Sequence, residues 1–475
     1  MKNDLLSILT PHGQEHLLAF WDQLSDAQRQ DLAAQIRSID FVLLDRLYAR
    51  RNDKSNIHDL ADRAAPPPAI RLDGSQNPFT PRQALRQGRE ALAAARVGTI
   101  LVAGGQGTRL GFDHPKGMYS IGLVSRRTLF QIHVEKIVAA SRRYGVKIPL
   151  YLMTSPKTHR ETVAFFQQHN RFGLPKDDLF IFCQGTLPAV DAATGKVLLE
   201  TPSQIAVSPD GHGGMLAALA SSGGLNDALQ RGIRHLFYFQ VDNPLVDVCA
   251  PEFIGYHILA ESELTTQVIA KRDPLDKVGN VVQVDGRLHV IEYSDLPDDV
   301  AQRKNPDGSL AVWAGSIAVH MMDTAMLRRL AETAEGLPFH YAHKKVAYID
   351  TSCWGDSSTV ATTKGRRIEP DTPNAIKFER FIFDLMPLAS NAIVVEIDPQ
   401  EGFGPLKNAS GAAADTPEMV QSMMIAQHTR WLKQAGAEVD DNVAVEICPL
   451  FALDAEELAQ KIPPKTRVTT PTYFS

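Results

Sequence analysis

The chain has 475 residues and a formal net charge of −6, with acidic and basic residues mixed along its length. This balance argues against a nucleic-acid coat protein, and no stretch approaches the roughly 20 apolar residues of a membrane-spanning helix. The four cysteines lack CxxC spacing, which argues against a zinc knuckle or a redox motif. We therefore expect a cytoplasmic protein with neither a membrane nor a nucleic-acid partner.

Residues 1–95 are predicted to form an N-terminal helical domain that ends in a linker. Apolar residues recur at helical spacing after Thr10-Pro11, which predicts a helix beginning there. Ser25 and Gln28 form a capping-box pattern ahead of a second helix. Three successive prolines at 66–68 cannot continue a helix and are typical of a linker.

Residues 96–390 alternate between strand and helix patterns, which predicts an α/β domain. Four apolar runs have the length of buried strands: residues 99–103, 148–154, 179–183 and 235–241. Amphipathic segments between them indicate a mixed, mainly parallel sheet with helices on both faces. Alternating apolar residues around Asp285-Gly286 predict an antiparallel hairpin beside the sheet. Residues 391–475 are expected to form a small C-terminal part.

A glycine-rich loop follows the first of these strands and is the most informative part of the sequence. Its four glycines, which begin with Gly104 and Gly105, lie within eight residues. Glycines after a buried strand let backbone N–H groups approach a phosphate. Arg109 and Lys116 add two cations, which suggests a polyphosphate ligand. The residue order is not that of a P-loop, and Leu110 stands where a dinucleotide fingerprint needs a glycine.

Further segments have a composition that packing alone does not require. Asp242 follows a predicted buried strand, at the edge of an α/β sheet where ligands bind, and is the candidate Mg²⁺ ligand. Gly211 and His212, in PDGHGG, precede a predicted helix whose N-terminus favours anions. Lys407 stands two residues after Gly404-Pro405, and its ammonium is suited to binding a phosphate. Each candidate also has a plain structural alternative. Asp242 could cap a helix, Gly211 and His212 could form an ordinary helix entry, and Lys407 could be a surface lysine.

Taken in order, these segments resemble the motifs of the UDP-sugar pyrophosphorylase family, most of all its eukaryotic-type UDP-N-acetylglucosamine group. The matching strings are LVAGGQGTRLG…PKGMYSIGL, PDGHGG, VDNPLVDVCAPEFIGY, VGNVVQVDG…VIEYSDL, NAIKFERFIFD and FGPLKNA. The resemblance covers about residues 10–460. It implies a Rossmann-like nucleotidyltransferase core with an N-terminal helical domain and a small C-terminal domain.

The resemblance also implies a role for each candidate residue. The nucleotide would be bound by the following residues: Ala103, Gly104, Gly105, Gln184, Gly211 and His212. Arg109 and Lys116 would bind the phosphates of UTP, and Lys407 would hold the sugar phosphate. Asp242 would bind Mg²⁺ (or Mn²⁺). The sugar pocket would be lined by Gly279, Glu292, Tyr293 and Ser316.

The reaction implied joins UTP to a sugar 1-phosphate, foremost N-acetylglucosamine 1-phosphate, and releases pyrophosphate. The family usually has Asn where this chain has His212 and Ser316. Serine lacks the donor–acceptor pair of an amide, so glucose or galactose 1-phosphate is an alternative substrate. A non-catalytic sugar-nucleotide sensor is a second alternative, and an NAD-dependent oxidoreductase is disfavoured by Leu110. The abbreviated C-terminal part leaves the oligomeric state open.

Overall fold

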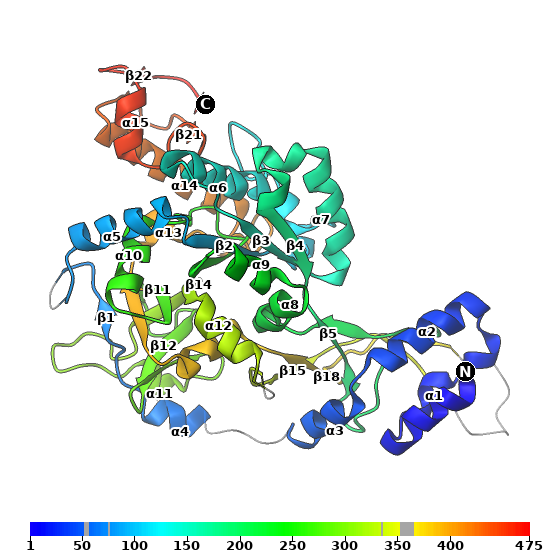
Figure 1. Ribbon diagram of the computed structural model, residues 1–475. Helices are drawn as coiled ribbons and strands as arrows, with labels where there is room; N and C mark the ends of the chain where they lie inside the picture. The colour runs from blue at the N-terminus through cyan, green and yellow to red at the C-terminus, as the bar shows by residue number, and fades with distance from the viewer. Residues whose placement is uncertain (52–56, 75–76, 334–335, 352–364) are drawn as a thin grey trace. The chain divides into compact units, whose positions relative to one another are not determined.

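The computed structural model describes residues 1–51, 57–74, 77–333, 336–351 and 365–475. The chain forms two compact units, each built from separated segments (Figure 1). The first unit comprises Met1–Ser55, Gly185–Gly214 and Leu337–Ile382. The second comprises Asn56–Gln184, Met215–Gly336 and Phe383–Ser475. The three consecutive domains expected from the sequence stay a prediction.

The first unit packs three helices on short strands. The helices are α1 (Lys2–Leu9), α2 (Asp26–Ser38) and α3 (Phe41–Ala49). The predicted capping box is confirmed, because the Ser25 side chain accepts from the Gln28 backbone N–H and the Gln28 side chain accepts in return. The prediction that a helix begins at Thr10-Pro11 is wrong. Gly13 adopts a left-handed φ of 64° there, and short 3-10 turns replace the helix.

The strands of the first unit give its helices a surface to pack on. A three-stranded sheet has the order β15 (His340–Lys344), β18 (Ala375–Glu379) and β6 (Val190–Asp191). Three two-stranded pairs accompany it: β5 (Thr186–Pro188) with β9 (Val207–Pro209), β7 (Leu199–Thr201) with β8 (Gln204–Ile205), and β16 (Tyr348–Ile349) with β17 (Arg367–Ile368). Buried Ile376 and Phe378 of β18 belong to the same core as Leu17 and Trp21.

The second unit is built on a mixed sheet that has ten strands among the described residues. Eight of them form one continuous order: β1 (Ala69–Ile70), β19 (Ala392–Glu396), β11 (Leu264–Ala270), β14 (Ala314–Asp323), β10 (His235–Gln240), β2 (Val97–Val102), β3 (Leu150–Thr154) and β4 (Leu179–Cys183). Strands β10, β2, β3 and β4 are parallel, and β14 is antiparallel to both its neighbours. The predicted mixed, mainly parallel sheet is therefore confirmed.

The predicted hairpin is also confirmed and joins this sheet through β14. Its strands are β12 (Gly279–Val284) and β13 (Arg287–Ile291). Asp285 and Gly286 both have positive φ, 50° and 79°. Positive φ at both central residues is what a type I′ turn requires, and Asp-Gly adopts it readily.

Helices cover the sheet of the second unit. The longer ones are α5 (Pro81–Ala93), α6 (Leu129–Tyr144), α7 (Pro156–Gln168), α10 (Pro251–Leu259), α12 (Thr324–Ala331) and α14 (Pro417–Gln434). Helices α5 and α10 cross closely, since a Cβ at Gly88 would lie 1.7 Å from the Pro251 oxygen and one at Gly255 equally close to the Ala84 oxygen.

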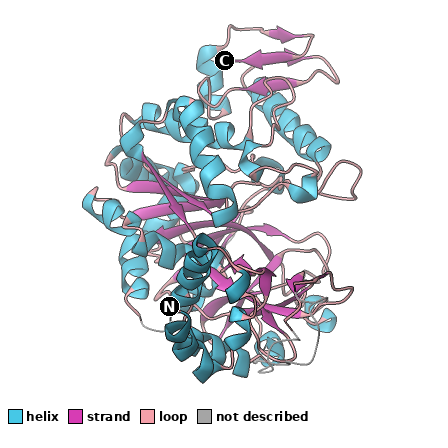
Figure 2. Cartoon of the chain, turned by 90° about the vertical axis from the view of Figure 1, so that its right-hand side faces the viewer, coloured by secondary structure: helices cyan, strands magenta, loops and turns pink. Residues whose placement is uncertain are grey.

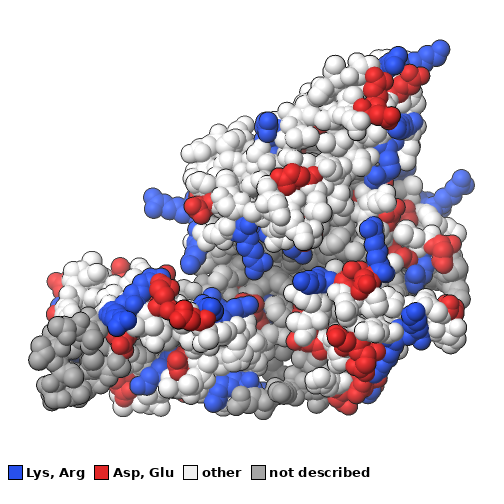
Figure 3. Space-filling model, turned by 180° about the vertical axis from the view of Figure 1, so that it is seen from behind, with Lys and Arg blue, Asp and Glu red and all other residues white. Residues whose placement is uncertain are grey.

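The end of the second unit carries α15 (Ala455–Lys461) and two small strand pairs apart from the central sheet (Figure 2). These pairs are β20 (Glu438–Val439) with β22 (Arg467–Val468), and β21 (Val445–Ile447) with β23 (Thr472–Phe474). On the face shown in Figure 3, basic and acidic side chains are interspersed. None of the helices in the described ranges has the length and apolar character to cross a membrane.

Candidate functional site

The glycine-rich loop leaves the carboxyl end of β2 beside the carboxyl end of β10. Gln240 pairs with Val102, and the backbone N–H of Val241 donates to the Val102 oxygen at 3.1 Å. Ala103 follows β2 directly, and Asp242 follows Val241. The glycine loop and the candidate metal ligand therefore start from the same edge of the sheet, which is where parallel α/β sheets bind ligands.

The loop folds back on itself after Gly105. The backbone N–H of Lys116 donates to the Gly105 oxygen at 3.0 Å. Gly117 fits because it lacks a side chain, since a Cβ there would lie 2.3 Å from Cζ of Phe130 in α6. This packing fixes the point from which the Lys116 side chain extends.

The structure brings Gln184 against the glycine loop. Gln184 follows β4, and its backbone N–H donates to the Thr154 oxygen at 2.8 Å. Its side-chain Oε1 lies so near Gly104 that a Cβ at that position would be 2.4 Å from it. The Ser155 hydroxyl donates to the Gly104 oxygen at 2.7 Å. A flat ligand on Gly104 would therefore have an amide at its edge.

Lys116 and Asp242 form the polar centre of the second unit. The Lys116 ammonium lies 3.6 Å from Oδ2 of Asp242 and donates to the Leu406 oxygen at 3.3 Å. The backbone N–H of Leu406 in turn donates to the Asp242 oxygen at 2.8 Å. Lys407 is the next residue, so three segments that are far apart in sequence meet at this point.

Asn243 fastens two of these segments together. Its side chain is buried, accepts from the Gly404 backbone N–H at 3.0 Å and donates to the Gly402 oxygen at 2.8 Å. The loop that carries Asp242 is thereby attached to the loop that carries Lys407. Sequence reasoning did not assign Asn243 a role, although its place directly after Asp242 was a usable signal.

Asp415 is a second residue that sequence reasoning missed. Its backbone oxygen accepts from the N–H groups of Lys407 and Asn408 at 2.9 and 3.1 Å. Burial raises the pKa of the Asp415 carboxyl; the cation of Lys407 opposes this rise, and the anion of Asp242 adds to it. Two carboxylates and the ammonium groups of Lys116 and Lys407 therefore influence one another here.

Lys136 of α6 supports the loop after Asp242. Its ammonium donates to the oxygens of Pro244 and Val246 at 2.6 and 2.7 Å. Burial lowers the pKa of Lys136 to about 8. A lone lysine in a helix pattern gave no signal of this contact.

Arg109 lies on the same loop as Lys116 and is exposed, in the 3-10 turn Thr108–Leu110. Its guanidinium makes no hydrogen bond or ion pair with the residues that the structure describes. An exposed arginine beside the glycines can reach a phosphate without first breaking a hydrogen bond or ion pair to the described part of the chain.

Three of the four predicted sugar-pocket residues come together on the hairpin and β14. Gly279 pairs with Ser316, and a Cβ at Gly279 would lie 3.7 Å from Oε1 of Glu292 and 3.8 Å from Cβ of Ser316. The Ser316 hydroxyl accepts from the Ala318 N–H at 3.4 Å. Tyr293 follows Glu292 and is about half exposed. Carboxylate and hydroxyl groups around a glycine can hydrogen-bond sugar hydroxyls.

Gly211 and His212 belong to the first unit. A Cβ at Gly211 would lie 2.3 Å from the Arg380 oxygen, so this glycine allows a close backbone approach. Nδ1 of His212 accepts from the Ile382 N–H at 3.1 Å, and its ring stacks on Phe381 at 5.3 Å. Burial lowers the pKa of His212 to about 4, so the imidazole is neutral near pH 7.

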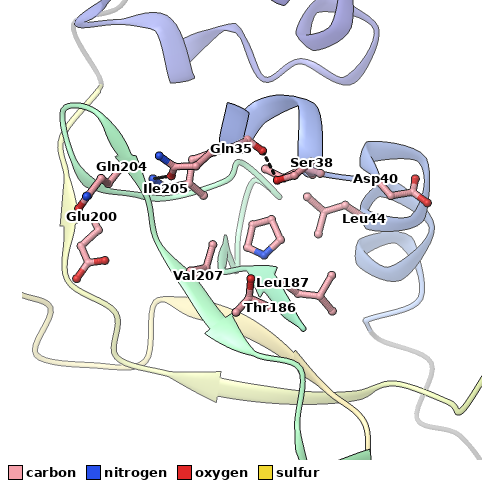
Figure 4. Close-up of a pocket in the computed structure, with 12 residues that line it drawn as sticks. Gln35, Ser38, Asp40, Leu44, Thr186, Leu187, Glu200, Gln204, Ile205 and Val207 are labelled. Atoms are coloured by element: carbon pink, nitrogen blue, oxygen red, sulfur yellow. Dashed lines mark hydrogen bonds between the residues drawn. The ribbon is translucent and has the colours of Figure 1, made fainter. Parts of the chain in front are cut away.

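The first unit also contains a cavity of about 460 Å³ between its helices and strands (Figure 4). Gln35 and Ile205 line it and are joined, because the Gln35 side chain accepts from the Ile205 N–H at 2.9 Å. The cavity is lined by none of the residues predicted from the sequence to bind nucleotide, sugar or metal.

Comparison with known proteins places this geometry in context. The family model described as UTP–glucose-1-phosphate uridylyltransferase matches residues 46–463. The chain is 37% identical over 455 residues to UDP-N-acetylhexosamine pyrophosphorylase-like protein 1 of Homo sapiens, covering 93% of this chain and 87% of that protein. It is 35% identical over 472 residues to UDP-N-acetylglucosamine pyrophosphorylase of Saccharomyces cerevisiae, covering 96% of each.

A solved structure is similar over nearly the whole chain. The uridine diphosphate N-acetylglucosamine pyrophosphorylase of Trypanosoma brucei, crystallised with an inhibitor, matches with a TM-score of 0.81. It is 26% identical and covers 98% of both chains. The likeness therefore extends across both units and is not confined to the edge of the sheet that carries the glycine-rich loop.

Proposed function

The chain belongs to the UTP–glucose-1-phosphate uridylyltransferase family and is a UDP-sugar pyrophosphorylase, and we propose that its sugar substrate is N-acetylglucosamine 1-phosphate. The products are then UDP-N-acetylglucosamine and pyrophosphate. The names of the Saccharomyces cerevisiae and Trypanosoma brucei relatives support this choice. The observation that carries the proposed site is the meeting of Lys116, Asp242 and the Lys407 loop at one edge of the sheet.

The proposed roles follow from charge. A sugar phosphate oxygen attacks the α-phosphorus of UTP, the bond to the β-phosphate oxygen breaks, and pyrophosphate leaves. The attacking phosphate is ionised near neutral pH, so the reaction needs alignment and charge neutralisation more than a strong base. Arg109 and Lys116 neutralise the UTP phosphates in this proposal, and Lys407 holds the sugar phosphate.

The residues around Asp242 fit a magnesium ion. Mg²⁺ is bound in proteins by one or two carboxylates together with substrate phosphates. Asp242 supplies one carboxylate, and the carboxylate of Asp415 influences Asp242 electrostatically. When bound, Mg²⁺ would offset negative charge on the phosphates. In the free protein the ammonium of Lys116 offsets the negative charge of Asp242.

In the same proposal the uracil lies on Ala103, Gly104 and Gly105 with its edge toward Gln184. The contact between Gln184 and Gly104 supports this arrangement. Gly211 and His212 belong to the first unit, and their role toward the nucleoside stays a prediction from the sequence. Gly279, Glu292, Tyr293 and Ser316 form the sugar pocket.

A second candidate substrate is glucose or galactose 1-phosphate, and Ser316 is the observation that favours it. A serine hydroxyl is shorter than an asparagine amide and lacks its separate donor and acceptor atoms, which could pair with the two polar groups of an N-acetyl substituent. The two candidates differ only in the sugar, so the chemistry at Lys116 and Asp242 is the same for both.

The test is a panel of sugar 1-phosphates, each mixed with the full chain, UTP and Mg²⁺ while pyrophosphate release is recorded. The proposal expects the highest kcat/KM with N-acetylglucosamine 1-phosphate. A higher value with glucose or galactose 1-phosphate would transfer the assignment to that sugar. If none of the sugars released pyrophosphate, the assignment would fail and a sugar-nucleotide sensor would be favoured.

A further inference from the structure

A second group of possible metal ligands lies at the other end of β10. His235 is the first residue of β10, His257 is in the last turn of α10, and Asp323 ends β14. Asp242 follows the far end of β10, about 20 Å away at roughly 3.3 Å per residue along an extended strand. This cluster is therefore separate from the nucleotide-binding edge.

The three side chains converge on one point. Oδ1 of Asp323 lies 2.6 Å from Nδ1 of His235 and 3.0 Å from Nε2 of His257. The two imidazole nitrogens are 3.2 Å apart, and the rings are nearly perpendicular, at 86°. Within the described residues this is the one group of three or more His, Cys, Asp or Glu side chains whose ligand atoms gather in this way.

The backbone holds two of these residues in place. His235 and Asp323 are directly paired across β10 and β14. Asp323 also stands at the N-cap of α12, where an aspartate usually accepts from the helix N–H groups, yet its side chain makes no such bond. The carboxylate is turned to the imidazoles, so its orientation serves this cluster.

His257 has the surroundings of a metal-binding histidine. It is buried, and its Nδ1 lies 2.8 Å from Oγ1 of Thr265. Histidines that bind metal generally use the remaining ring nitrogen in such a contact, which fixes the ring and the tautomer. With the proton on Nδ1 and shared with Thr265, Nε2 presents its lone pair to the other two side chains.

We propose that His235, His257 and Asp323 bind one divalent transition-metal ion of the zinc class, which ties β10, β14 and α10 together. Two imidazoles and one carboxylate are a donor set that suits Zn²⁺ or Co²⁺ better than Mg²⁺. Zinc bonds of about 2.0–2.2 Å in a tetrahedral site separate the ligand atoms by about 3.3 Å. The present spacings need only a small outward movement, and water completes the coordination on the exposed side.

This ion has a structural role and is distinct from the magnesium ion proposed at Asp242. In its absence, the same side chains form a hydrogen-bonded group in which both imidazoles donate to Asp323. A metal displaces these hydrogen bonds and requires each proton on the far nitrogen of its ring. The two states are distinguishable by metal uptake.

The experiment uses the full chain without a histidine tag, freed of metal by chelation and titrated with Co²⁺, whose visible absorption reports its coordination. The proposal expects one equivalent bound with the absorption of a tetrahedral nitrogen–oxygen site. The affinity of Asp323→Asn for Co²⁺ should be at least about 100-fold lower than that of the wild type. Such a loss exceeds the usual effect of removing a residue that contacts only a metal ligand. Zn²⁺ should raise the unfolding temperature of the wild-type chain and not that of the variant.

His12→Gln is the matched control, because His12 forms a pair with Asp45 at 2.5 Å that has no third ligand among the described residues. This variant should still bind one equivalent. His235→Gln should match Asp323→Asn, and Mg²⁺-dependent turnover should be unchanged in both, so the result is independent of the proposed substrate. Equal Co²⁺ uptake by the wild type and Asp323→Asn, or no stoichiometric uptake by the wild type, would overturn the proposal.

Discussion

The ammonium of Lys116 lies 3.6 Å from the carboxylate of Asp242, although the two residues follow different strands of the sheet. Lys116 also donates to the Leu406 oxygen, and the Leu406 N–H donates to the Asp242 oxygen. A cation and an anion are thus held together at the edge where we propose that the substrates bind. In the proposed complex the ammonium of Lys116 pairs with a nucleotide phosphate and the carboxylate of Asp242 binds a metal ion. Each charged side chain therefore exchanges its present partner for another of opposite charge.

Asp415 should help to position this site. Asp415→Asn removes an anion that acts on Lys407 and Lys116 without altering side-chain size. We expect kcat to fall roughly 10–100-fold, as for the loss of an outer-sphere partner, with a smaller change in the KM for UTP. Steady-state kinetics measure both, with the exposed Asp441→Asn as control. An unchanged kcat would remove Asp415 from the account.

Gly104 should control the placement of Gln184. A Cβ at Gly104 would lie 2.4 Å from Oε1 of Gln184, so Gly104→Ala must displace that amide. We expect a loss of selectivity for UTP over CTP, measured as the ratio of kcat/KM values. A Cβ at Gly105 meets nothing within 4 Å, so Gly105→Ala is the comparison. If both variants lost the same amount of selectivity for UTP over CTP, the added methyl group would be crowding the nucleotide, and displacement of Gln184 would not be the cause.

Ser316 should affect the choice of sugar. It is paired with Gly279, which Glu292 also approaches, so a longer amide side chain there would extend over the same glycine. Ser316→Asn should raise the preference for N-acetylglucosamine 1-phosphate over glucose 1-phosphate about tenfold, the worth of one good hydrogen bond. Ser316→Val, which cannot form that bond, should not. A similar preference in both variants would speak against a role for the amide.

Glu263 should contribute a pH-dependent part of the stability. Arg329 binds its carboxylate with two hydrogen bonds, at 2.6 and 2.8 Å, and the Ser390 N–H adds a third. These contacts, Arg329 foremost, lower the pKa of Glu263 from 4.5 to about 2. A lowered carboxyl pKa stabilises the fold above the unfolded value, and this contribution disappears as the pH falls from 4.5 toward 2.

Glu263→Gln should therefore lower the free energy of unfolding at pH 7 by about 1 kcal/mol, because the pair is partly exposed to solvent. The difference from the wild type should shrink at pH 3. Urea unfolding at the two pH values measures it. A difference that stayed constant with pH would show that the carboxylate charge does not stabilise the fold.

Local sequence patterns predicted much of the second unit. The runs at 179–183 and 235–241 became β4 and β10 almost residue for residue, because buried parallel strands are continuously apolar. The Asp285-Gly286 turn was predictable because few residues accept positive φ. The common edge of Ala103 and Asp242 followed from both residues coming directly after parallel strands.

Contacts between distant segments could not be predicted in this way. The first unit gathers three separated stretches of chain, and no local pattern specifies that association. Asp415 looks like an ordinary loop residue until the fold brings Lys407 and Asn408 to it, and the position of Asn243 after Asp242 did not reveal its contacts with Gly402 and Gly404. The helix expected from Thr10 failed because one glycine in a left-handed conformation outweighed the apolar spacing around it.

The most direct test of the proposed site is pyrophosphate release from UTP and N-acetylglucosamine 1-phosphate by the wild type, Lys116→Met and Asp242→Asn. We expect both variants to be slower by at least roughly 100-fold, the usual effect of removing one group that stabilises transition-state charge. Their unfolding midpoints should stay near that of the wild type, and the exposed Lys147→Met should retain full activity. Release at the wild-type rate by either variant would contradict the placement of catalysis at this edge of the sheet.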